Sequence, residues 1–256
     1  MVKDGKPVFS YSQLNNFETC PYGWHLLYQE RVPRQDNCFS LYGSIVHGLL
    51  ERYAKGEVDK AALEDLFDWE FDSITEPWPP NKYVDLEQSY RDKGRAFFRV
   101  FEGLEDVKIL GVEKHFYIDR GFYWLQGYID LVYETRDGKL VCRDWKSTKA
   151  YTKQQLAEHQ RQVYLYSAPC IEWYGKPPDV LEFYHFRDER KRSKVRFNQA
   201  DYEETLAWAD EKAEELLNAW SYPHHYDDWF CNQLCSARSS CEYREKERKK
   251  LYAQRH

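Results

Sequence analysis

Hydrophobic and polar positions along the chain change their period near residue 108. Before this point apolar residues recur at the spacing of amphipathic helices, and after it they alternate as in strands. The early helices are expected to begin at Ser10 and to cover about 40–54, 59–75 and 84–105. The later pattern predicts strands over 109–118, 128–146, 179–186 and 194–197, and helices over 153–173, 198–219 and the charged C-terminal residues. The sequence therefore predicts an α/β protein with helical additions before and after a central sheet.

The stretch 128–146 predicts a β-hairpin that carries chemistry. Two runs of β-forming residues flank a turn at 136–138, and a three-residue loop with Gly138 in the left-handed region places Asp130 opposite Asp144. Cross-strand neighbours have Cβ atoms only about 5 Å apart, so two carboxylates there repel each other. Alternation puts Lys146 on the same face as Asp144. We expect a divalent cation between the carboxylates, although a lone Asp-x-Lys is weak evidence and also occurs on solvated strand faces.

Composition narrows the class of protein. The 256 residues suffice for one large domain, and 42% hydrophobic and 17% aromatic residues suffice for a core. There is no apolar run long enough for a membrane span and no leader-like N-terminus, so we expect a cytoplasmic protein. A net charge of −6 argues against a generally basic nucleic-acid-binding protein but leaves room for a local basic groove. Basic residues cluster at Arg187, Arg190, Lys191, Arg192, Lys194 and Arg196, which is also typical of a solvated hairpin.

Further candidate site residues lie on the predicted helices and on the first strand. His47 shares a helix face with Gly43, and Gly43 and Gly48 permit close approach of a backbone or a substrate, although a histidine among apolar residues is more often a packed one. Glu113 lies on the strand over 109–118, where an acid is more often at the surface. On the helix over 153–173, Gln162 pairs with Tyr166 and Gln160 with Tyr164 at a spacing of four residues.

The seven cysteines predict metal ligation instead of a disulfide framework. Intracellular proteins rarely hold disulfides, and Cys231, Cys235 and Cys241 crowd into eleven residues. Cys20 stands at a proline break between two helical turns, which suits a ligand on an exposed corner. Cys38, His224 and His225 are possible substitutes. Four thiolates suit a [4Fe–4S] cluster, tetrahedral zinc fits the same ligands, and reduced structural cysteines without metal are the remaining interpretation.

Taken in order, these motifs resemble the RecB-like branch of the PD-(D/E)XK nucleases over most of the chain. The matching elements are Gly43-x-x-x-His47, Glu113, Gly127-Tyr-Ile-Asp130, Asp144-Trp-Lys146 and Gln162-x-x-x-Tyr166. The four cysteines are similar to the iron–sulfur staple of AddB-type helicase–nucleases and of CRISPR-associated exonucleases. The last three read C-x3-C-x5-C where the family commonly has C-x2-C-x5-C, a one-residue departure.

The resemblance implies a restriction-endonuclease-like mixed β-sheet flanked by helices. It implies one nuclease domain over 1–256, with a helical part at about 10–105, the catalytic sheet and helix at about 108–198 and the cysteine-bearing segment at about 199–256. His47, Glu113, Asp130 and Asp144 would hold Mg²⁺ or Mn²⁺. Lys146 would position water or stabilise charge on the phosphate, while Gln162 and Tyr166 would orient Lys146 or contact DNA.

The implied activity is that of a DNA exonuclease acting on free, single-stranded ends in repair, recombination or replication. No Walker-type phosphate loop is visible, so unwinding would need a helicase or recombination partner. Two other classes stay open: a non-catalytic DNA-binding subunit of a recombination or CRISPR-adaptation complex, and a zinc-stapled protein-interaction domain. The first would be expected to lose one of Asp130, Asp144 and Lys146, and the second leaves the facing carboxylates unexplained.

Overall fold

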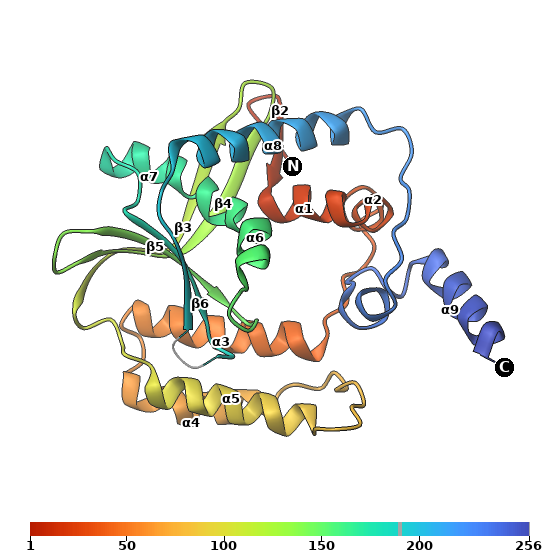
Figure 1. Cartoon of the computed structure of the whole chain (residues 1–256), viewed down its shortest axis with the longest axis horizontal. Helices are drawn as coiled ribbons and strands as arrows, with labels where there is room; N and C mark the ends of the chain where they lie inside the picture. Colours follow the sequence, from red (N-terminus) through yellow and green to blue (C-terminus); the bar gives the residue numbers. More distant parts are fainter. Residues whose placement is uncertain (189–190, 256) are drawn as a thin grey trace.

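A mixed seven-stranded sheet organises the structure, a computed structural model that describes residues 1–188 and 191–255 (Figure 1). The strand order is β1-β2-β4-β5-β6-β7, and β3 pairs with the other edge of β4. β2 and β4 run parallel, as do β5 and β6, while the remaining pairs are antiparallel. The strands are β1 (Val2–Lys3), β2 (Lys6–Ser10), β3 (Val107–Asp119), β4 (Trp124–Thr135), β5 (Leu140–Lys146), β6 (Val180–His185) and β7 (Lys191–Val195). Of the basic cluster at 187–196, Arg190 lies outside the described residues.

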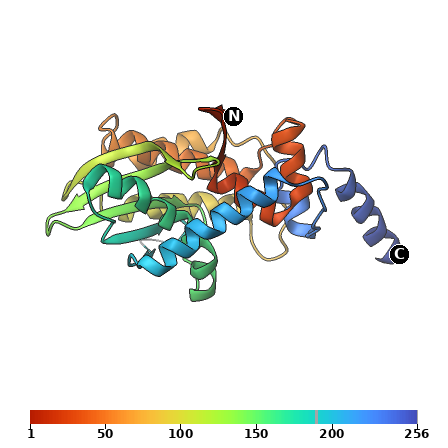
Figure 2. The same cartoon turned by 90° about the horizontal axis from the view of Figure 1, so that it is seen from above.

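Helices cover both faces of the sheet, which confirms the predicted fold class (Figure 1). One face carries α3 (Cys38–Ala54), α4 (Leu63–Phe71) and α5 (Leu86–Val100). The other carries α6 (Lys153–Leu165), α7 (Ser167–Tyr174) and α8 (Gln199–Leu217). The remaining α-helices are α1 (Tyr11–Thr19), α2 (Pro21–Trp24) and α9 (Glu242–Arg255), which projects from the body of the molecule (Figure 2). Two π-helices, His25–Gln29 and Phe230–Leu234, and a 3₁₀ helix, Lys60–Ala62, complete the helical segments among the described residues. No helix among the described residues is long and apolar enough to cross a membrane.

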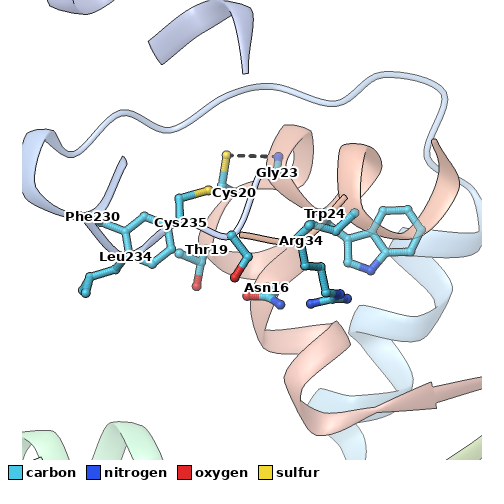
Figure 3. A pocket seen from close by; sticks show the side chains of 11 residues that line it. Asn16, Thr19, Cys20, Gly23, Trp24, Arg34, Phe230, Leu234 and Cys235 are labelled. Carbon is cyan, nitrogen blue, oxygen red and sulfur yellow. Dashed lines mark hydrogen bonds between the residues drawn. The ribbon is translucent and has the colours of Figure 1, made fainter. Parts of the chain in front are cut away.

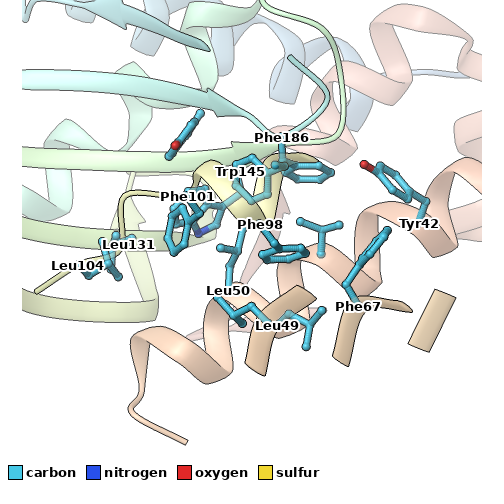
Figure 4. Close-up of a cluster of buried hydrophobic side chains, with 14 of the residues drawn as sticks. Tyr42, Leu49, Leu50, Phe67, Phe98, Phe101, Leu104, Leu131, Trp145 and Phe186 are labelled. Atoms are coloured by element: carbon cyan, nitrogen blue, oxygen red, sulfur yellow. The ribbon is translucent and has the colours of Figure 1, made fainter. Parts of the chain in front are cut away.

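The largest hydrophobic cluster fixes α3 against the sheet. Tyr42, Val46 and Leu50 of α3 are fully buried and meet Trp145 of β5 (Figure 4). Rings of α4 and α5 close this cluster from below, and the ring of Phe67 comes within 2.1 Å of the place that a Cβ on Gly94 would occupy. Gly94 therefore lets two helices approach more closely than any larger residue would allow.

Most predicted elements are present with different bounds, and the strand expected over 194–197 is β7, which begins earlier, at Lys191, and ends at Val195. The capping box of Ser10 and Gln13 starts α1 as expected. The helix expected over 153–173 is instead two helices that meet at Tyr166. The helix expected over 59–75 is instead a short 3₁₀ turn followed by α4. The helix expected over 84–105 is α5, which ends at Val100. Strands β1 and β2 were not predicted, because each is too short for a periodic signal.

Candidate active site

Helix α3 brings His47 to the end of β5. Nε2 of His47 lies 2.8 Å from the carbonyl oxygen of Trp145. A carbonyl only accepts hydrogen bonds, so Nε2 carries the proton and Nδ1 keeps a lone pair. A Cβ on Gly43 would lie 3.4 Å from the hydroxyl of Ser147, an ordinary van der Waals distance, so Ser147 is close but the packing does not require glycine. Gly48, by contrast, has no neighbour within 4 Å of a Cβ position, so the close approach expected there is absent.

Glu113 and Asp130 lie opposite each other at an irregularity shared by β3 and β4. The pairs Val112–Leu131 and Lys114–Ile129 enclose them. Val112 and Leu131 pack against the α3 side of the sheet, whereas Ile129 packs on the α6 side. Residues two apart on a regular strand share one face, so both strands change faces here.

The backbone of Glu113 supplies this change of face. Its φ is +47°, in the left-handed region that costs a residue with a side chain about 1–2 kcal/mol. Such a cost persists only where the surrounding structure imposes it, and it occurs often at functional sites. The result is that the Glu113 carboxylate joins those of the site instead of pointing to solvent.

His47, Glu113 and Asp130 converge. Each offers a ligand atom within 4.8 Å of the others, and no other three His, Cys, Asp or Glu side chains in residues 1–188 and 191–255 do so. Nδ1 of His47 is 3.7 Å from Oδ2 of Asp130. The three side chains bring two carboxylates and one imidazole lone pair together, which is a donor set suited to a divalent cation.

The electrostatics of this group favour a bound cation. Burial and the charge of Asp144 raise the pKa of Asp130 well above its ordinary value. Burial and Glu51 raise the pKa of Glu113. Burial lowers the pKa of His47, which keeps the imidazole neutral. A cation among them would offset the cost of burying both carboxylates.

Asp144 belongs to a second network on the α6 side of the sheet. Its Oδ1 accepts hydrogen bonds from Gln162 and Tyr166, each at 2.8 Å. The Nζ of Lys146 lies 2.7 Å from Oδ2 of Asp144 and donates to Oε1 of Gln162 at 2.9 Å. Oδ2 is buried, and the contact with Lys146 is an ion pair without an aligned hydrogen bond. This oxygen therefore has capacity left for a cation.

Lys146 stays charged in this network. Burial disfavours the ammonium, but Asp144, Tyr151 and Asp130 together outweigh burial, so the pKa of Lys146 is raised. Burial and Asp144 together raise the pKa of Tyr166 well above its ordinary value, so its hydroxyl remains a donor. Lys146 can stabilise negative charge but cannot serve as a proton-accepting base in this state.

The hairpin has the predicted turn and register, and its two carboxylates make different hydrogen bonds. Gly138 has φ +77°, and the pairs from Glu134–Leu140 to Leu131–Arg143 give the predicted register. Pairing ends there, one position before Asp130 and Asp144. Oδ2 of Asp130 instead accepts a 2.7 Å hydrogen bond from the backbone N–H of Trp145. Of the four expected metal ligands, His47, Glu113 and Asp130 converge, while Asp144 is turned toward Lys146.

The choice between two Gln–Tyr pairs is clear in the geometry. Gln162 and Tyr166 contact Asp144 and each other, with Nε2 of Gln162 2.9 Å from the Tyr166 hydroxyl. Tyr164 instead donates to Asp201 and to the carbonyl oxygen of Arg196. The N–H of Trp145 was missed by the sequence analysis, since a backbone contact leaves no residue-type signal.

All four cysteines expected to form a cluster line one small pocket, although Cys20 is far from the others in sequence. Cys20 caps α2, and its sulfur accepts from the N–H of Gly23 (Figure 3). Figure 3 shows Cys235 beside it. Burial raises the pKa of Cys231 and Cys235, with contributions from the neighbouring cysteines. Cys38 is buried elsewhere, whereas His224 and His225 also line the pocket.

Comparison with known families identifies the superfamily of the chain. The model of the PD-(D/E)XK nuclease superfamily matches residues 8–242, nearly the whole chain. The chain belongs to this superfamily. Membership as a PD-(D/E)XK nuclease implies a divalent-metal-dependent nuclease with a DNA substrate, and the chain contains a His47–Glu113–Asp130 group whose ligand atoms converge.

Solved structures resemble the PD-(D/E)XK nuclease described here at low sequence identity. One is named "Putative exonuclease", from Eubacterium rectale, with a TM-score of 0.53 and 12% identity over 90% of this chain and 86% of that chain. Another, the protein SSO0001, has a TM-score of 0.43 and 14% identity over 95% of this chain and 89% of that chain. No curated protein matches significantly.

Proposed function

We propose that this nuclease is an exonuclease of the RecB-like branch that uses Mg²⁺ or Mn²⁺ and acts on free ends of single-stranded DNA. Repair, recombination and replication are the processes that use such an activity. The observation that carries the proposal is the convergence of His47, Glu113 and Asp130 next to the Asp144–Lys146–Gln162–Tyr166 network.

Each side chain has a distinct role in this proposal. Nδ1 of His47 and the carboxylates of Glu113 and Asp130 would hold the cation, and the buried Oδ2 of Asp144 would complete the set. The cation supplies Lewis acidity toward a phosphate oxygen and lowers the pKa of bound water. Lys146 provides a fixed positive charge for the phosphate as negative charge develops. Gln162 and Tyr166 hold both Asp144 and Lys146 in place.

A cleavage assay tests the activity. Linear DNA labelled at either end and a closed circle are incubated with Mg²⁺, with Mn²⁺ or with EDTA. We expect metal-dependent loss of mononucleotides or short products from the linear strand only. Lys146→Ala and Asp130→Ala should abolish it. Lys139→Ala and Asp137→Ala are matched controls, because this exposed pair lies at the other end of the same hairpin.

Two outcomes would reject the proposal in different ways. Wild-type activity in both Lys146→Ala and Asp130→Ala would remove these residues from the mechanism. Metal-independent DNA binding without any cleavage would favour the non-catalytic subunit instead. Digestion of the circle would replace exonuclease with endonuclease action. Comparison of single-stranded with blunt double-stranded ends tests the strand preference.

We also propose a [4Fe–4S] cluster held by Cys20, Cys231, Cys235 and Cys241. The support is that all four line one pocket and that no three of their sulfur atoms lie within 4.8 Å of one another. Tetrahedral zinc with Zn–S bonds of about 2.3 Å requires sulfur atoms about 3.8 Å apart, so the wider arrangement favours a cluster. Burial of Cys231 and Cys235 disfavours free thiolates unless a metal compensates.

Anaerobic purification followed by visible absorption and by iron and zinc analysis tests the cluster. About four irons per chain with a broad visible band are expected, and Cys20→Ser should lose both. Cys38→Ser, at a buried cysteine that does not line the pocket, should retain both. One zinc per chain without iron would replace the cluster with a zinc site, and a folded, metal-free protein would reject both.

A further inference from the structure

A groove leads away from the active site toward the cysteine-bearing segment. It begins at Ser147 and Thr148, directly after Lys146, and passes Tyr90 of α5. Its far end is formed by Trp229 and by Leu234 of the π-helix. The groove therefore connects the residues that follow Lys146 with the segment that carries Cys231 and Cys235.

Three cationic side chains from different elements gather beside this groove. Lys93 lies on α5, Lys149 follows β5 and Arg187 follows β6, where it lines the groove. Their proximity is evident in the pKa of Lys93, which burial, Arg187 and Lys149 lower. None of the three makes an ion pair within 4.0 Å in the part of the chain that the structure describes.

Arg187 lines the groove with its guanidinium against an aromatic ring. Its guanidinium carbon lies 4.2 Å from the centre of the Tyr90 ring, which holds the group by a cation–π contact. Its Nε is buried and has no hydrogen-bond partner among the described residues. The guanidinium has no ion-pair partner among the described residues, so its charge is available to a phosphate in the groove.

An aromatic side chain is available at the far end of the groove. Trp229 is 49% exposed, and its ring lies 6.1 Å from that of Phe39. Exposed aromatic rings next to cations are how proteins bind unpaired bases, because each base stacks on a ring while the phosphates meet positive charge. In a duplex both faces of a base are already stacked on neighbouring bases, so this arrangement suits a single strand.

A second exposed aromatic row lies on the other side of the metal group, where His115 stacks on Tyr128 with ring centres 4.4 Å apart. Two of the nearby cations there are neutralised, whereas Lys114 lies over the Trp173 ring and makes no ion pair with any residue that the structure describes. Lys3 pairs with Asp4 at 2.7 Å, and Lys6 pairs with Asp119 at 2.8 Å. Charge therefore favours the groove over this row as the path of a polyanion.

We propose that the groove binds single-stranded DNA adjoining the bond to be cleaved, with phosphates on Lys93, Lys149 and Arg187 and a base stacked on Trp229. The proposal rests on the proposed nuclease function and names the part of the protein that selects single strands. Because Trp229 and Leu234 belong to the cysteine-bearing segment, loss of a metal from the cysteines would also disturb this wall of the groove.

Binding without cleavage tests the groove. Fluorescence anisotropy with a labelled poly-dT strand of about 20 nucleotides and a blunt duplex is measured on the full chain in EDTA, since a site of this kind covers about 4–16 nucleotides. The Lys149→Ala/Arg187→Ala variant should bind the single strand about 10-fold more weakly or worse. The slope of log affinity against log salt should be shallower by about 1.4, which is about 0.7 for each phosphate that the variant no longer neutralises. Trp229→Ala should weaken single-strand binding by about 5- to 150-fold and change duplex binding less.

Matched variants keep the result interpretable. Lys108→Ala/Arg136→Ala removes two positive charges at the opposite end of the sheet and should leave affinity within about twofold. Lys149→Glu reverses one exposed charge, so it is expected to fold and still to lose affinity. Equal losses in the groove and control variants would overturn the proposal. So would wild-type affinity in the groove variants together with a loss in Tyr128→Ala, which would assign the strand to the other aromatic row.

The groove and the proposed function can fail separately. If the groove variants bind single strands more weakly but the wild type never cleaves DNA, the groove is a binding site and the proposed nuclease activity is wrong. Metal-dependent cleavage with unchanged binding and unchanged KM in the groove variants would retain the activity and reject the groove.

Discussion

The backbone strain at Glu113 can be measured as a difference in the free energy of unfolding between two variants. Its φ of +47° is a conformation that glycine adopts freely and other residues adopt at a cost of about 1–2 kcal/mol. Glu113→Gly and Glu113→Ala both remove the carboxylate, but only glycine removes the backbone strain. We therefore expect the glycine variant to be more stable than the alanine variant by about 1 kcal/mol. For a chain of this size this difference corresponds to about 2–4 °C in Tm.

Urea unfolding in EDTA, followed by tryptophan fluorescence, measures the difference. The matched pair is Lys108→Gly and Lys108→Ala on the same strand, where φ is not positive and glycine should be the less stable choice. Both variants at position 113 should lose metal-dependent cleavage. A glycine variant at position 113 that is no more stable than the alanine variant would refute the strain argument.

Three further results are expected. In EDTA the free energy of unfolding of the wild type should fall as pH rises from about 4, because the raised pKa of Asp130 makes the native state hold a proton that the unfolded chain has lost. Urea titrations over this pH range should show a smaller fall for Asp130→Asn, and an equal fall in the two proteins would contradict the prediction. The affinity for Mn²⁺, measured by titration calorimetry, should weaken as pH is lowered from about 8 to about 5, since protons compete for Asp130 and Glu113 while His47 stays neutral. An affinity that does not change with pH would exclude these residues as ligands. Gln162→Ala should lower kcat about 10- to 100-fold, because the variant lacks the hydrogen bonds of Gln162 to Asp144 and Lys146. Gln160→Ala should keep the kcat of the wild type, and equal rates in the two variants would remove Gln162 from the site.

Features decided by local chemistry could be predicted from the sequence. The hairpin turn and its register follow from Arg136-Asp137-Gly138, because Gly138 alone of these tolerates the left-handed region. The start of α1 follows from the side-chain cap that Ser10 and Gln13 form, three residues apart. In both cases the residues that decide the structure are close neighbours in the chain.

Features decided by distant contacts could not be predicted. The change of face at Glu113 depends on how β3 and β4 together meet helices on both sides of the sheet, and no residue near Glu113 signals it. The orientation of Asp144 depends on Gln162 and Tyr166 of another element. The order of the motifs indicated which residues belong to the site, while the directions of their carboxylates emerged only in three dimensions.

The docking of the cysteine-bearing segment has a consequence for the biosynthesis of the protein. Arg238 donates to the carbonyl oxygen of Gln35, 203 residues earlier, and the N–H of Gln35 donates to the carbonyl oxygen of Ser236. Gln35 leads directly into α3, which carries His47. At a synthesis rate of about 5–20 residues per second, the ribosome needs about 10–40 s to supply these partners. The segment that leads into α3 therefore lacks these partners until residues 236–238 have been synthesised.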